Sequence, residues 1–156
     1  MSDLKDLKEL TRAKEAQERE EMQNKILERL KSIKRDGIDE LIKYLLEKTD
    51  YFIAPASTKF HSNFDGGLAF HSDNVVELML QKNRQYNLGL SNDTIYLTGY
   101  MHDLCKCNIY EKTMRLKKDE MTGKWIGYAS YEINETVPLG HGEKSVILLQ
   151  QFVKLT

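Results

Sequence analysis

Apolar residues recur at helical spacing along most of the chain and alternate with polar residues in one segment. Segments with the helical pattern end in turn or capping signals such as Gly37, Asn87 to Gly89 and Ser91. In the alternating segment, two short runs at 113–117 and 124–131 flank the polar turn 119–123. This arrangement is typical of a β-hairpin. The pattern therefore predicts a mostly α-helical fold with one hairpin inserted at about 113–131. The helical segments are 26–33, 38–46, 68–86, about 92–103 and about 141–153.

The first 25 residues differ from the rest of the chain. Leu4, Leu7 and Leu10 have short apolar spacing, but 14–25 is almost entirely polar, rich in helix formers and without Gly or Pro. We expect an exposed, charged helical arm at 1–25 and a globular domain at 26–156. Either the arm is simply solvated, or it binds a protein partner or a second copy of the chain.

Overall composition limits the function classes. The chain has 156 residues, enough for one domain, and a net charge of −1, which excludes a global basic field for nucleic acid or anionic lipid. No apolar stretch approaches the roughly 20 residues that cross a bilayer, so no membrane association is expected. Cys105 and Cys107 are too close in sequence to pair on one helix, and reduced thiols fit a cytoplasmic protein.

The pair His102-Asp103 is the strongest candidate for chemistry. It follows an apolar helical run and is itself followed by Lys106, so two metal-binding side chains and a cation lie within about one turn. The chain has only four histidines. His71 stands near the start of an earlier helix and His141 near the start of the last one. This arrangement predicts a metal site built from several helices.

At these residues the sequence resembles the HD-domain superfamily of metal-dependent phosphohydrolases, from about Ile38 to the C-terminus. It looks most like small HD proteins of bacteria and phages. Around Gly66-Gly67-Leu68 it is similar to the HD domain of bacterial 3′-to-5′ exoribonucleases. The ordered set of motifs carries the resemblance: Phe60-His61, Gly66-Gly67-Leu68 with His71, Met101-His102-Asp103-Leu104-Cys105-Lys106 and Leu139-Gly140-His141-Gly142-Glu143-Lys144-Ser145.

The resemblance implies an HD-like helical bundle that hydrolyses a phosphomonoester or phosphodiester of a nucleotide or short oligonucleotide with metal-bound water. Imidazole and carboxylate ligands suit one or two ions of Mn, Fe, Ni, Co or Zn better than Mg or Ca. The implied ligands are His71, His102, Asp103 and His141. Asp103 is also a candidate catalytic residue.

Two lysines and a further histidine are candidates for handling the substrate. Lys106 and Lys144 are candidate contacts to the substrate phosphate, with Lys106 also a candidate catalytic residue. His61 is a candidate acid for the leaving group. Both lysines have a plain alternative as solvated side chains.

Structural alternatives exist for the other residues too. His71 and His141 can each serve only as residues near a helix start, and Asp103 can form an ion pair with Lys106 or Arg115. Aromatic residues on the predicted hairpin either pack or stack on a nucleobase. These aromatic residues are Trp125, Tyr128 and Tyr131.

One departure from the family pattern affects the predicted activity. HD phosphohydrolases usually complete the metal shell with an Asp on a later helix, but no Asp follows Asp119 and His141 is the last histidine. We expect the domain to lack its C-terminal helices because the sequence is shortened. The alternative is a natural, catalytically impaired scaffold that binds a nucleotide or a protein.

Overall fold

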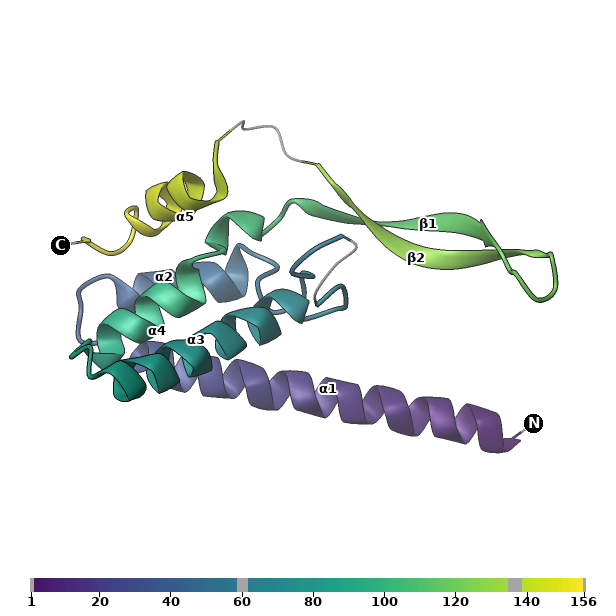
Figure 1. The fold of residues 1–156 in the computed structure, drawn as a ribbon, viewed down its shortest axis with the longest axis horizontal. Coiled ribbons are helices and arrows are strands. Elements are labelled where there is room, and N and C mark those ends of the chain that lie inside the picture. Colours follow the sequence, from purple (N-terminus) through teal and green to yellow (C-terminus); the bar gives the residue numbers. More distant parts are fainter. Residues whose placement is uncertain (1, 59–61, 135–138, 156) are drawn as a thin grey trace.

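The computed structural model describes residues 2–58, 62–134 and 139–155. Within these residues the chain forms helices joined by short loops, together with one two-stranded antiparallel sheet (Figure 1). This confirms the mostly α-helical fold with an inserted hairpin. The elements are α1 (Ser2–Lys31), α2 (Ile38–Glu47), α3 (Gly67–Tyr86), α4 (Asn92–Met101), the 3-10 helix η1 (Leu104–Lys106), β1 (Tyr110–Lys118), β2 (Trp125–Ile133) and α5 (His141–Leu149).

The hydrophobic core lies between the C-terminal end of α1 and helices α2, α3 and α4. Residues four apart on α1, Ile26 and Leu30, are fully buried, as are Leu41 and Leu45 on α2. This spacing places each pair on one helix face, so a single apolar stripe from each helix fills the core. The apolar pattern of the sequence thus determines which faces pack.

The N-terminal part of α1 extends beyond this core. Side chains at 10–21 are all exposed, and the helix continues without interruption into the buried turn at Ile26. Strong helix formers and the buried C-terminal turns support this extension. The division at residues 25 and 26 therefore falls inside one helix, and the role of 1–25 as a separate arm stays a prediction.

Helices α3 and α4 pack closely because Gly99 has no side chain. A Cβ at this position would approach Val76 Cγ2 at 2.5 Å and Met79 Sδ at 3.3 Å. Ser91 caps α4 by accepting a hydrogen bond from the Thr94 N–H at 3.2 Å, as predicted. Close packing of the two helices brings the end of α4 beside the beginning of α3.

The predicted hairpin is confirmed, and it is longer than expected at both ends. Its register pairs Tyr110 with Ile133 and Lys118 with Trp125. In the turn, one oxygen of Asp119 accepts hydrogen bonds from the Met121 and Thr122 N–H groups at 3.1 and 2.7 Å. The hairpin and the N-terminal part of α1 project to the same side of the helical core (Figure 1).

The predicted helix at about 92–103 ends earlier than expected, and Cys105 and Cys107 do not lie together on one α-helix. Helix α4 ends at Met101, Asp103 has φ −110° and ψ 21°, and a 3-10 turn follows. Helix α5, which begins at His141 as predicted, packs against this turn, where the Cys105 N–H donates to Ser145 Oγ at 3.1 Å. Both cysteines are free thiols.

Among the described residues, no helix is both long enough and apolar enough to cross a membrane.

Candidate metal centre

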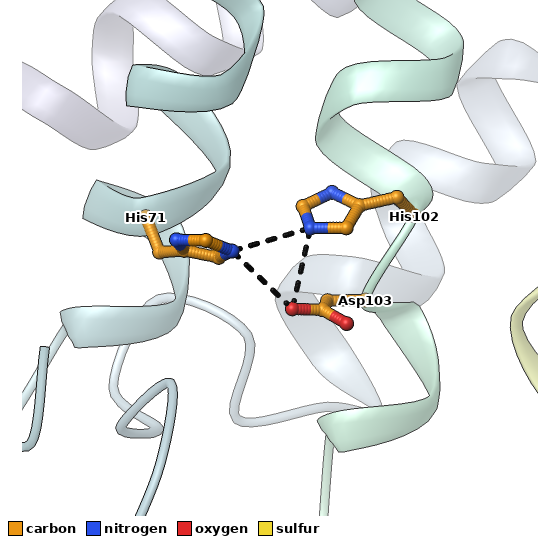
Figure 2. A group of neighbouring side chains, drawn as sticks. All are labelled: His71, His102 and Asp103. Atoms are coloured by element: carbon orange, nitrogen blue, oxygen red, sulfur yellow. Dashed lines mark hydrogen bonds and ion pairs between the residues drawn. The ribbon is translucent and has the colours of Figure 1, made fainter. Parts of the chain in front are cut away.

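Three of the predicted ligands lie together where α3 meets the end of α4. His71 is on the first part of α3, His102 caps the C-terminus of α4, and Asp103 follows it at the entrance to η1. Figure 2 shows the two imidazoles and the carboxylate pointing toward one another from the two helices. Within the described residues, this is the one group of three or more His, Cys, Asp or Glu side chains that is close enough to share an ion.

The distances within the group suit a single ion. His71 Nε2 and His102 Nε2 are 3.3 Å apart, and Asp103 Oδ2 lies 3.5 Å from the first and 3.3 Å from the second. Ligand atoms held about 2.1 Å from one ion are separated by about 3.0 Å at a right angle and about 3.4 Å at a tetrahedral angle. The residues present therefore fit a metal with two nitrogen ligands and one oxygen ligand, a set that favours transition metals.

The orientation of His102 is set by the backbone of its own helix. Its Nδ1 lies 2.8 Å from the Gly99 carbonyl oxygen, so Nδ1–H donates and the lone pair of Nε2 faces the group. The hydrogen bond with Asp103 raises the pKa of His102 above its ordinary value; burial opposes this and the Gly99 carbonyl adds to it. A proton and a metal ion therefore compete for Nε2.

Asp103 is held as a carboxylate. Burial by itself would raise its pKa, but hydrogen bonds from His102 and Lys106 outweigh burial and keep the pKa far below its ordinary value. The Lys106 Nζ lies 2.8 Å from Asp103 Oδ2 and also donates to the Ala56 carbonyl at 3.0 Å. The structural ion pair between Asp103 and Lys106 is thus present, whereas Arg115 pairs with Glu132 on the hairpin.

The other predicted site residues lie outside this group. His141 is exposed, and its Nδ1 contacts Cys105 Sγ at 3.5 Å rather than the other histidines. Lys144 is partly buried on α5, the helix that packs against η1. His61 lies outside the residues that the structure describes. The structure thus brings together His71, His102, Asp103 and Lys106.

A network of charged residues between α1 and α3 was not predicted. Asp73 is buried and accepts hydrogen bonds from the Tyr100 hydroxyl at 2.9 Å and Lys25 Nζ at 2.7 Å. Arg29 contacts both Asp73, at 3.3 Å, and Glu77, at 2.8 Å. The sequence carried a signal for this network, because the bases on α1 and the acids on α3 are each spaced four residues apart.

Comparison with known proteins finds a similarity that covers part of a longer relative. The chain is similar to the 3′-5′ exoribonuclease YhaM of Geobacillus sp. (strain WCH70), with 29% identity over 139 residues. The match covers 85% of this chain and 42% of the exoribonuclease, so the chain spans less than half the length of that relative. No protein-family model matches the chain, and no solved structure matches it.

Proposed function

We propose that this chain is an HD-type, metal-dependent phosphohydrolase that cleaves phosphodiester bonds of RNA or short oligonucleotides. The observation that carries the proposal is the triangle of His71 Nε2, His102 Nε2 and Asp103 Oδ2, whose edges of 3.3 to 3.5 Å match the ligand spacing around one ion. The HD resemblance and the similarity to an exoribonuclease supply the substrate class.

Each residue of the group has a distinct task in this proposal. His71, His102 and Asp103 hold a divalent transition metal, which supplies a water of lowered pKa and offsets negative charge on the phosphate. The Gly99 carbonyl keeps His102 in the tautomer that binds metal. Lys106 orients Asp103 through its 2.8 Å contact and brings a positive charge to the substrate phosphate.

A noncatalytic scaffold is the second candidate, and one observation favours it. The group contains three metal-binding side chains, and within the described residues no fourth His, Cys, Asp or Glu joins them. A site with this donor set can bind a metal and a nucleotide without hydrolysing it. Glu143, in the first turn of α5, is a carboxylate residue near the last predicted ligand, His141. It is not one of the three residues of the group.

The test compares hydrolysis by the chelator-treated chain before and after addition of Mn²⁺, Co²⁺, Ni²⁺, Fe²⁺ or Zn²⁺. Substrates are 5′-labelled single-stranded RNA, nucleotides, cyclic nucleotides and a small chromogenic phosphodiester. We expect metal-dependent cleavage that falls at least about 100-fold in Asp103→Asn, because removing a ligand costs more than removing an outer-shell partner. Asp39→Asn, an exposed aspartate on α2, is the matched control. Metal and nucleotide binding without turnover on any substrate would support the scaffold instead.

A further inference from the structure

One face of the hairpin exposes a row of apolar and aromatic side chains. Alternation along the paired strands places ten residues on this face, which we call the tryptophan face. Trp125 is 68% exposed, Met114 73% and Leu116 68%. The residues of the tryptophan face are Tyr110, Lys112, Met114, Leu116, Lys118, Trp125, Gly127, Ala129, Tyr131 and Ile133.

Such a face is costly to leave in water. A two-stranded sheet has little stability by itself, and contiguous exposed apolar groups mark binding surfaces. Gly127 and Ala129 lie between Trp125 and Tyr131 on the same strand face, so the two aromatic rings flank a stretch with small side chains. The face therefore offers exposed apolar side chains, Met114 and Leu116, beside a strand that carries the rings of Trp125 and Tyr131.

The charge of the hairpin favours a negatively charged binding partner. The distal half, 115–128, carries four basic and two acidic residues, a balance of +2 in a chain with a net charge of −1. Lys118 lies directly opposite Trp125 in the register, and Lys112 Nζ lies 5.7 Å from the centre of the Tyr131 ring on the same face. Aromatic rings beside lysines are the means by which proteins bind single-stranded nucleic acid, through base stacking and phosphate contacts.

The tryptophan face leads toward the metal centre. Tyr131 packs against Tyr110, with ring centres 6.4 Å apart, and the Tyr110 hydroxyl donates to the Ala56 carbonyl at 3.2 Å. The same carbonyl accepts from Lys106, which contacts Asp103. Four contacts thus connect Tyr131 with the candidate metal ligand Asp103.

A cavity of about 1040 Å³ borders the same face, between the hairpin, the N-terminal part of α1 and the start of α3. Its wall includes Lys112, Ala129 and Tyr131 from the hairpin and Phe70, the residue before His71. The lining has four basic and four acidic residues, so the cavity does not itself attract phosphate. The excess of positive charge lies on the distal hairpin.

We propose that the tryptophan face binds single-stranded RNA and guides it to the metal centre. A base stacks on Trp125, Lys118 contacts a neighbouring phosphate, and the strand continues past Tyr131 toward His71. This inference rests on the proposed function for its substrate class. It adds a binding surface outside the catalytic group and explains why an exposed aromatic side chain lies on a projecting hairpin.

Trp125 is the only tryptophan in the chain, so its fluorescence reports on this face alone. The experiment titrates the metal-free, full-length chain with a single-stranded oligoadenylate of twelve nucleotides. We expect saturable quenching that weakens as salt increases, since phosphate contacts release counterions. No quenching at low salt, up to oligonucleotide concentrations far above that of the protein, would overturn the proposal.

Matched variants test the two faces of the hairpin with a labelled oligoadenylate. Trp125→Ala should weaken binding about tenfold, in line with the loss of one stacked base. Ile126→Ala, on the opposite face and 39% exposed, should leave the affinity within about twofold. Lys118→Gln should reduce the slope of log affinity against log salt by about 0.7. Equal affinities for the Trp125 and Ile126 variants would contradict the inference.

The same variants separate this inference from the proposed function. If the chain hydrolyses RNA and both variants keep its KM, the tryptophan face does not guide RNA, although the enzyme proposal stands. If Trp125→Ala abolishes RNA binding by a chain that hydrolyses no substrate, the inference stands and the enzyme proposal fails. Sedimentation velocity measures whether the chain self-associates. If the chain binds no RNA but self-associates, and Trp125→Ala abolishes that self-association, the tryptophan face binds a second copy of the chain instead of RNA.

Discussion

Two buried aspartates, Asp73 and Asp103, lie close to the packed ends of α3 and α4 but have different surroundings. Asp73 accepts short hydrogen bonds from Lys25 and the Tyr100 hydroxyl, at 2.7 and 2.9 Å, and also contacts Arg29. Its charge and that of Glu77 are balanced by two cations. Asp73 therefore has its partners within the protein, as a structural carboxylate requires.

Asp103 has one cation, Lys106, and two imidazoles at 3.3 and 3.5 Å, which are longer contacts than the hydrogen bonds that Asp73 accepts from Lys25 and Tyr100. The two imidazoles also face each other through Nε2 atoms 3.3 Å apart. Three atoms that can bind a metal thus converge at this point. Burial is common to both aspartates, whereas only Asp103 has two imidazole nitrogens at the spacing of metal ligands.

The largest expected effect is on stability. Asp73→Asn should lower the free energy of unfolding by about 3 kcal/mol, because it leaves Lys25 and Arg29 partly buried without their shared charge. Asp103→Asn should cost about 1 kcal/mol in the presence of chelator, since Lys106 keeps its bond to the Ala56 carbonyl. Urea denaturation with chelator measures both. Equal losses would remove the distinction between the two carboxylates.

A substitution between the two aspartates should disturb both regions. The added Cβ in Gly99→Ala would meet Val76 Cγ2 at 2.5 Å, so α4 must move away from α3, at a cost of about 1–3 kcal/mol. The shift also separates His102 from His71 and should weaken metal binding. Thermal unfolding and a metal titration of the same variant check both effects. Unchanged metal affinity would mean that close helix packing does not position the ligands.

The pH dependence should have opposite signs with and without metal. The pKa of His102 is raised above about 6.5 by its hydrogen bond with Asp103, so its protonated form stabilises the metal-free fold. That contribution is complete below pH 6.5 and is lost as pH rises through the higher pKa of the folded state. Metal affinity should instead increase with pH over the same window, because the ion displaces a proton.

Denaturation at several pH values between 6 and 8, with chelator and with metal, tests this prediction. The expected change is up to about 1.4 kcal/mol for each proton displaced per pH unit. His102→Gln should lose the pH dependence in chelator. Parallel curves with and without metal would contradict a role for His102 as a ligand.

The smallest effect should come from Tyr100→Phe. It removes the hydroxyl that donates to Asp73 at 2.9 Å and should cost about 1 kcal/mol, while metal affinity stays unchanged. Urea denaturation and a metal titration measure the two quantities. A large loss of metal affinity would show that the two aspartates act as one network.

The fold could be predicted from the sequence where one pattern dominates. A change of period predicted the hairpin, and the polar segment 119–123 predicted its turn. The end of α4 was missed because no Gly or Pro marks it. Asn108, with φ 60° and reciprocal hydrogen bonds to Asp50, redirects the chain after η1, and these are contacts between residues 58 positions apart.

The candidate site was predicted in part for a similar reason. His102 and Asp103 are neighbours in sequence, and the HD resemblance connected them with His71. The resemblance also implied that His141 is a ligand. The sequence alone could not show whether α5 places His141 near the other histidines. The network around Asp73 was missed because its charges come from helices whose packing partners the sequence does not specify.

The central claim is that His71, His102 and Asp103 bind one transition-metal ion. The most direct measurement is a calorimetric titration of the chelator-treated chain with Mn²⁺ or Co²⁺, with His71→Ala and His141→Ala as matched histidine variants. We predict one ion per chain, at least about 100-fold weaker binding in His71→Ala, and little change in His141→Ala. No binding by the unmodified chain, or equal losses in the two variants, would contradict the account.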